Sequence, residues 1–236
     1  MSTYVLIHGA FHGAWMWDKV VPLLQVKGHR VVTLDLPGHG EDTTLPATVT
    51  LQAYVDRVCE AIDKESEQVV LVGHSMGGMV ISQAAENRPE KVKSLVYLAA
   101  MLPHNGESLF QLNQGDKFAL PLPVGISEDQ TYLQLDVSRI KDNFYGECSD
   151  EDVAFAQEKL CRQPLAPFIT PVQLSEERYG SIPRKYISTS IDRAISIEFQ
   201  RELQERTHCQ EVVTIDSDHS PFFSDPEKLV GVLIDI

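Results

Sequence analysis

One segment of the sequence, VVLVGHSMGGMVISQAAE, constrains the fold more than any other. It places Gly73-His74-Ser75-Met76-Gly77 between an apolar run, Val69–Val72, and an amphipathic stretch that ends near Asn87. A serine at such a strand-to-helix junction is typical of a nucleophile elbow, which lifts the hydroxyl above the carboxyl ends of the strands. The turn strains the serine backbone, and Gly73 and Gly77 avoid collisions across it. Ser75 is therefore the candidate nucleophile.

The same glycine-rich junction could serve only tight packing, or could cradle a phosphate as nucleotide-binding loops do. Neither GxGxxG nor the lysine of a P-loop is present, and the flanking strand and helix match the elbow. The elbow also leaves the amide of Met76 at a helix N-terminus, aimed at where negative charge would develop. We therefore expect Met76 to supply one oxyanion-hole donor.

Six short apolar runs, bounded by Gly, Pro, Asp or His, predict strands buried on both faces. They are Tyr4–Ile7, Val31–Leu34, Val69–Val72, Leu95–Leu98, Lys185–Ser188 and Val212–Ile215. Segments of helical period lie between them, the clearest behind a Thr50 N-cap, with Leu51, Tyr54, Val55, Val58 and Ile62 on one face. The alternation predicts an α/β fold with a mainly parallel sheet flanked by helices.

The alternation stops between about residues 103 and 183, where Pro, Gly and aromatic residues are frequent and only Asp150–Leu160 is predicted to be a helix. We expect one catalytic core, residues 1–103 and 184–236, with an inserted cap, residues 104–183. Apolar and aromatic side chains of the cap could line a pocket, although each more often holds a cap together than touches a ligand. These are Phe110, Phe118, Leu120, Leu122, Phe144, Tyr145, Phe155 and Phe168.

Charge and cysteine content exclude several classes of protein. The chain has 20 Lys and Arg against 34 Asp and Glu, and this acidic balance disfavours nucleic acid and membrane as partners, because both need a basic face. The four cysteines lack CxxC or Cys/His ligand spacing, so we expect reduced, mostly buried thiols. With neither a basic leader nor an apolar run of ~18 residues, the simplest expected location is the cytoplasm.

A second oxyanion-hole donor is expected from the loop that follows the first predicted strand, His8-Gly9-Ala10-Phe11-His12-Gly13. Its glycines let the backbone approach a bound ester, and we assign the donor to the amide of Ala10. His8 and His12 are four residues apart but lie in a glycine-rich turn without the glutamate of HExxH. They are therefore predicted to shape the loop, and no metal is expected.

Position in the predicted fold selects the base and its acid. Of the eight histidines, only His219 follows the last strand and precedes the closing helix, which gives the chain order Ser, acid, His. The alternative is that His219 is only a residue of a surface turn and has no catalytic role. Asp192 follows the strand Lys185–Ser188 and is the predicted acid. Asp216 and Asp218 are rivals, but a near neighbour in a tight turn cannot easily reach Nδ1 while Nε2 faces the serine.

Four stretches carry a family resemblance: VLIHGAFHGAWMWDKVVPLL, VVTLDLPGHG, VGHSMGG, and Asp192 followed by Glu198-Phe199-Gln200. On these, the chain resembles the plant methyl esterase and hydroxynitrile lyase family of the α/β-hydrolase superfamily, and similar bacterial carboxylesterases, over nearly its whole length. The resemblance implies the α/β-hydrolase fold and the Ser75–His219–Asp192 triad, with oxyanion amides on Ala10 and Met76. It further implies a small helical cap over a mostly apolar acyl pocket, no cofactor, and often a homodimer.

Two positions depart from the lyases that the chain resembles. Those lyases typically carry threonine at the position of Gly9 and lysine at that of Ser220, where plant methyl esterases usually have an apolar residue. The sequence therefore predicts a carboxylic ester hydrolase that works through a Ser-His-Asp triad and an acyl-enzyme. Its expected partner is a small to medium apolar or aromatic ester. A hydroxynitrile lyase-like C–C lyase and a non-catalytic ligand receptor are the alternatives.

Overall fold

The six predicted apolar runs all form strands, and these strands make one parallel sheet in the order β2-β1-β3-β4-β8-β9. The computed structural model describes residues 1–236. The strands are β1 (Thr3–Ile7), β2 (Arg30–Thr33), β3 (Val69–His74), β4 (Val92–Leu98), β8 (Arg184–Thr189) and β9 (Glu211–Ile215). The predicted α/β-hydrolase fold is confirmed.

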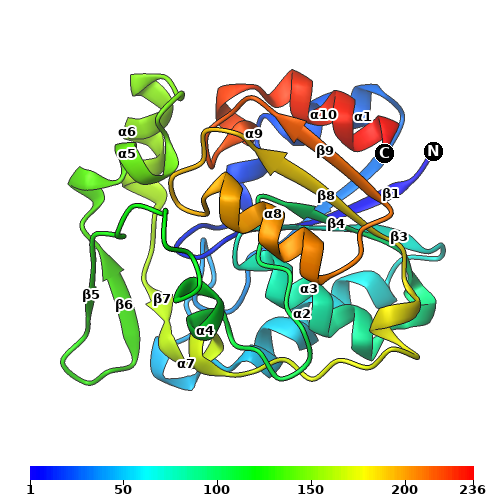
Figure 1. Ribbon diagram of the computed structural model, residues 1–236, viewed down its shortest axis with the longest axis horizontal. Coiled ribbons are helices and arrows are strands. Elements are labelled where there is room, and N and C mark those ends of the chain that lie inside the picture. The colour runs from blue at the N-terminus through cyan, green and yellow to red at the C-terminus, as the bar shows by residue number, and fades with distance from the viewer.

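Helices cover both faces of this sheet, as right-handed crossovers require. They are α1 (Val20–Val26), α2 (Leu51–Asp63), α3 (Gly77–Asn87), α8 (Ile197–Arg206), α9 (Pro221–Ser224) and α10 (Pro226–Asp235). The path from β1 to β2 runs opposite to the later crossovers, so α1 lies on one face together with α10, and α2, α3 and α8 lie on the other (Figure 1). The predicted cap of α2 is present, since Thr50 accepts a hydrogen bond from the Ala53 amide.

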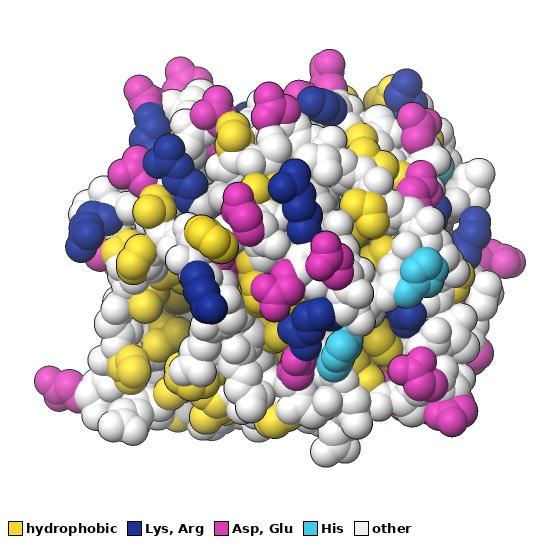
Figure 2. Space-filling view, in the orientation of Figure 1, with side chains coloured by type: hydrophobic (Ala, Val, Ile, Leu, Met, Phe, Trp, Pro, Cys, Tyr) yellow, Lys and Arg dark blue, Asp and Glu magenta, His cyan; other side chains and the backbone are white.

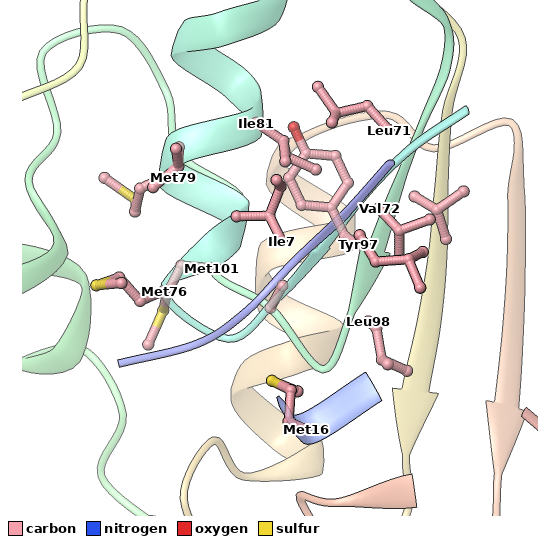
Figure 3. Close-up of a cluster of buried hydrophobic side chains, with 14 of the residues drawn as sticks. Ile7, Met16, Leu71, Val72, Met76, Met79, Ile81, Tyr97, Leu98 and Met101 are labelled. Atoms are coloured by element: carbon pink, nitrogen blue, oxygen red, sulfur yellow. The ribbon is translucent and has the colours of Figure 1, made fainter. Parts of the chain in front are cut away.

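Buried side chains from α3 and three strands meet beneath the start of α3 (Figure 3). Ile7 comes from β1, Leu71 from β3, Tyr97 from β4 and Ile81 from α3, and each is at most 1% exposed. Full burial of such side chains stabilises a fold by about 1.5–3 kcal/mol each. The junction between β3 and α3 is therefore anchored on both sides by packed core.

The segment between β4 and β8 adds no strand to the main sheet and projects from one end of it (Figure 1). It contains α4 (Leu109–Asn113), β5 (Val124–Ile126), β6 (Tyr132–Leu135), α5 (Lys141–Phe144), α6 (Asp150–Lys159), β7 (Gln163–Pro164) and α7 (Leu165–Ile169). The predicted helix corresponds to α6. The antiparallel sheet β5-β6-β7 was not expected, so the implied small helical cap is wrong in this respect. We propose residues 104–183 as the cap.

Short 3₁₀ helices occur at residues 14–17, 46–48, 89–91, 137–139 and 179–181. All four cysteines are free thiols, with Cys59 and Cys148 buried and Cys161 and Cys209 partly buried. None of the helices has the length and apolar character to span a bilayer. In Figure 2, acidic and basic side chains are interspersed over one face, and apolar side chains gather over the cap at the lower left.

Candidate active site

Ser75 lies in the turn between β3 and α3 with a φ of 54°, in the left-handed region that a residue with a side chain rarely adopts. Such a conformation costs on the order of 1–3 kcal/mol and persists only where the surroundings impose it. A Cβ at Gly73 would lie 2.7 Å from the Gly77 carbonyl group, and one at Gly78 would lie 2.0 Å from the Met101 oxygen. The turn thus has the strained geometry that the nucleophile elbow predicts.

His219 and Asp192 form a buried pair at the carboxyl end of the sheet. His219 Nδ1 lies 2.7 Å from Asp192 Oδ2, and the two side chains are 2% and 0% exposed. The Asp192 carboxylate also accepts hydrogen bonds from the amides of Ala194 and Ile195 at 2.8 and 2.9 Å. An acceptor at Nδ1 fixes the tautomer that carries its proton there, which leaves Nε2 as the basic nitrogen.

The two rival carboxylates do not contact the imidazole of His219. Asp218 is buried and accepts hydrogen bonds from the backbone amides of Glu147 and Ser220. Asp216 accepts one from the Ser190 hydroxyl at 2.5 Å. Of the three aspartates considered from the sequence, Asp192 alone meets the histidine.

Ser75 and His219 line one cavity, together with Ala10 and Met76. No hydrogen bond joins Ser75 to His219 in this structure; in enzymes without substrate, such contacts are often long and tighten only in the complex. The cavity volume is about 30 Å³, room for about one or two water molecules. Binding of an aryl ester, which is much larger than this space, therefore requires side chains of the walls to move.

The amides of Ala10 and Met76 are both free to bind an anion. Each residue lies outside the helices and strands, and neither amide takes part in a hydrogen bond within the protein. The next amide, that of Phe11, donates instead to Gln163 Oε1 at 3.3 Å, and Phe11 itself has a φ of 65°. Two unpartnered amides beside a nucleophile are the arrangement of an oxyanion hole.

His8 and His12 hold the loop that carries Ala10. Nδ1 of His12 donates to the Ala10 carbonyl at 2.7 Å, and Nε2 accepts from the Tyr145 hydroxyl at 2.7 Å. His8 Nε2 accepts from the Leu36 amide at 3.1 Å. Burial lowers the pKa of His8 to about 4 and that of His12 to about 3. Both are therefore neutral near pH 7 and act as fixed hydrogen-bonding groups.

The sequence did not single out two side chains that support the site. His74 donates from Nε2 to the His219 carbonyl at 2.9 Å, and burial holds its pKa well below the usual value. Gln200 is fully buried and donates to Asp192 Oδ2 at 3.3 Å. Signals existed for both, since His74 adjoins Ser75 and Gln200 ends one of the stretches that carry the resemblance.

The walls of the cavity are mostly apolar and come from the cap and the core. Of the eight cap residues considered, Leu122, Phe144 and Phe168 line it. Tyr145 contacts His12 instead, Phe155 packs on Trp15, and the other three are exposed. Wall residues that the sequence did not indicate are Phe11, Met101, Leu109, Asn113, Ala194 and Ile195. Figure 3 shows Met101 next to Met76 at the start of α3.

The sequence model of the "Alpha/beta hydrolase family" matches residues 4–232. "Putative methylesterase 11, chloroplastic" of Arabidopsis thaliana is 34% identical over 246 residues, 99% of this chain and 63% of that protein. The chain thus spans less than two thirds of that relative's length.

Two further proteins are similar over almost the whole chain. "Alpha-hydroxynitrile lyase" of Arabidopsis thaliana is 34% identical over 250 residues, 98% of this chain and 95% of that protein. The crystal structure of a pyrethroid hydrolase from Sphingobium faniae JZ-2 has a TM-score of 0.87 and 31% identity, and covers 99% of this chain and 96% of that one. Identity to the methylesterase and to the lyase is equal, so the site itself has to separate the two chemistries.

Proposed function

The chain belongs to the α/β-hydrolase family, and from this premise we propose that it is a serine carboxylesterase. Ser75 is the nucleophile, His219 the general base and Asp192 the acid that orients it, with Ala10 and Met76 as oxyanion donors. One observation carries the proposal: the buried His219–Asp192 pair and two unpartnered amides share a cavity with a strained serine. No cofactor enters the reaction.

The reaction proceeds through an acyl-enzyme. Ser75 Oγ bonds to the ester carbonyl carbon while its proton passes to His219 Nε2, and Asp192 stabilises the imidazolium. The Ala10 and Met76 amides hold the negative oxygen. The intermediate collapses as the carbon–oxygen bond to the alcohol breaks and the alcohol takes the proton from His219. A water molecule, deprotonated by His219, then attacks the acyl carbon. The bond from that carbon to Ser75 Oγ breaks, Oγ takes the proton back from His219, and the acid is released.

The substrate class follows from the walls of the cavity. Leu109, Leu122, Phe144, Phe168 and Ile195 present apolar surface around Ser75, which favours a small to medium apolar or aromatic ester. We propose such an ester as the partner and keep a cytoplasmic location and a homodimer as predictions from the sequence.

A C–C lyase is the second candidate, and two features disfavour it. A Cβ at Gly9 would lie 2.9 Å from His74 Nδ1 and 3.0 Å from Ser75 Cβ, so a threonine there requires both to shift. No lysine or arginine lines the cavity, and Ser220 is fully buried and absent from its walls. A leaving anion such as cyanide would therefore find no cation beside the reaction centre.

A non-catalytic receptor is the third candidate. A protein that only binds has no use for a strained serine beside two free amides. Incubation with a fluorophosphonate probe followed by peptide mass spectrometry tests the proposal. We expect an adduct on Ser75 and turnover of p-nitrophenyl and methyl esters graded by acyl size. Absence of both would favour a receptor.

A further inference from the structure

A buried carboxylate beside the base joins the cap to the core. Asp218 is 4% exposed and immediately precedes His219. Its Oδ2 accepts a hydrogen bond from the Glu147 amide of the cap at 2.8 Å, and the Cys148 thiol lies 3.5 Å from the same oxygen. Burial and this carboxylate raise the pKa of Cys148, so the thiol keeps its proton and remains a donor.

The other oxygen of the same carboxylate holds the turn that carries the histidine. Oδ1 accepts from the Ser220 amide at 3.0 Å and from the Ser224 hydroxyl at 3.1 Å. No cationic side chain pairs with Asp218, so these donors and the cap amide compensate for its burial. A buried carboxylate without such donors would strongly destabilise the fold.

The cap segment fixed in this way, Phe144–Cys148, also forms part of the active site. The Phe144 ring lies 5.6 Å from that of His219, centroid to centroid, and Phe144 lines the cavity. Tyr145 donates to His12, which holds the loop of Ala10. One short segment therefore contacts the base, the loop of an oxyanion donor and the Asp218 carboxylate.

We propose that Asp218 is a positioning residue that fastens the segment Phe144–Cys148 to the turn of His219. One carboxylate thereby fixes the position of Phe144, a wall of the cavity, and that of His219. Phe144 is the residue of this segment that lines the cavity, so the fastening fixes one of the walls against which an acyl group would fit. The consequence for turnover rests on the proposed esterase function, whereas the fastening itself does not.

Asparagine cannot replace this carboxylate, because it has one accepting oxygen and one donating amide. In one orientation its amide nitrogen faces the Glu147 N–H, and in the other it faces the Ser220 N–H. Asp216→Asn is the matched control, since it makes the same change two residues away, in a side chain that contacts Ser190 and not the cap.

Amide hydrogen exchange tests the fastening without any need for turnover. In Asp218→Asn we expect exchange in residues 144–148 to accelerate by about tenfold or more, with β3 unchanged and Asp216→Asn like the unaltered protein. Ester kinetics should show a raised KM for a bulky ester with a much smaller change in kcat.

A second measurement uses the unaltered protein, so it does not depend on whether the variant folds. The amides of Glu147 and Ser220 donate to one carboxylate, but only the first lies in the cap, which adds no strand to the main sheet, so it should exchange faster. Equal rates at the two amides would overturn the proposal, and so would unchanged or uniformly faster exchange throughout Asp218→Asn. If the unaltered protein shows no ester turnover, only the esterase function is refuted and the fastening is not.

Discussion

Gln200 reaches Asp192 from α8, and its side chain lies within hydrogen-bond distance of the carboxylate that also binds His219. The same amide group donates to the Ile195 carbonyl at 2.8 Å, and its oxygen accepts from the Thr189 amide at 3.1 Å. The acid is thereby held from β8 and from α8 at once.

Ser75→Ala should lower ester turnover by several orders of magnitude while the protein stays folded, because the triad acts as one unit. Steady-state kinetics with a p-nitrophenyl ester and circular dichroism check this. A variant that keeps more than about a tenth of the kcat, a loss of only ~1.4 kcal/mol, would show that Ser75 is not the nucleophile.

Asp192→Asn should lower kcat by about 10⁴-fold, because an amide in place of the carboxylate lets His219 adopt the wrong tautomer. Asp218→Asn should affect kcat far less, since Asp218 does not contact the imidazole. Measuring kcat for both variants on one ester checks the ranking, with Asp216→Asn as control. If Asp218→Asn lowered kcat more than Asp192→Asn, the acid would be Asp218, in the turn of His219.

Trimming the walls of the cavity should change acyl preference. Phe144→Ala and Phe168→Ala each remove an aromatic wall, and we expect kcat/KM ratios between long and short acyl esters to shift by ~1–3 kcal/mol. Phe118→Ala is the control, because Phe118 is 70% exposed and does not line the cavity. An unchanged ranking in both wall variants would place the acyl pocket elsewhere.

Acid should destabilise the fold through His8 and His12. Burial lowers their pKa values to about 4 and about 3, so below pH ~6.5 the unfolded chain binds protons that the folded chain does not. The free energy of unfolding should therefore fall as pH drops from ~6.5 toward 4, by up to ~1.4 kcal/mol per pH unit for each histidine. Urea unfolding across this range measures the slope, and His12→Gln should reduce it. An identical slope in His12→Gln would contradict the assignment.

Cyanohydrins should not be cleaved. Since no lysine or arginine lines the cavity, we expect negligible cyanide from mandelonitrile or acetone cyanohydrin at a pH that suppresses spontaneous breakdown, alongside measurable aryl ester hydrolysis. Cyanide release that disappears in Ser75→Ala, at a kcat/KM like that of the best ester, would establish the lyase instead.

The sheet could be predicted because its signals are local. Each strand is an apolar run between breakers, and the elbow is a contiguous motif around Ser75. The contact of Asp192 with His219 could be predicted as well, since a carboxylate just after a parallel strand reaches the same sheet edge as the serine. These features depend on sequence order and on general rules of chain topology.

The cap could not be predicted in the same way. Its strands are two to four residues long, and β7 pairs with β6 across a long stretch that includes α5 and α6. Asp218 shows a related limit: its closeness to His219 in the sequence made it a rival of Asp192 for the acid, but its partner Glu147 is 71 residues away. Long-range partners of single polar groups leave no periodic trace in one sequence.

Ser75 and Phe11 both line the candidate active-site cavity and both have left-handed backbones, with φ values of 54° and 65°. Each costs the fold about 1–3 kcal/mol, a sizeable fraction of the ~5–15 kcal/mol by which a domain of this kind stays folded. Glycine at either position would relieve this strain, but at position 75 it would also remove the proposed nucleophile. At position 75, greater thermal stability and the proposed chemistry therefore call for different residues.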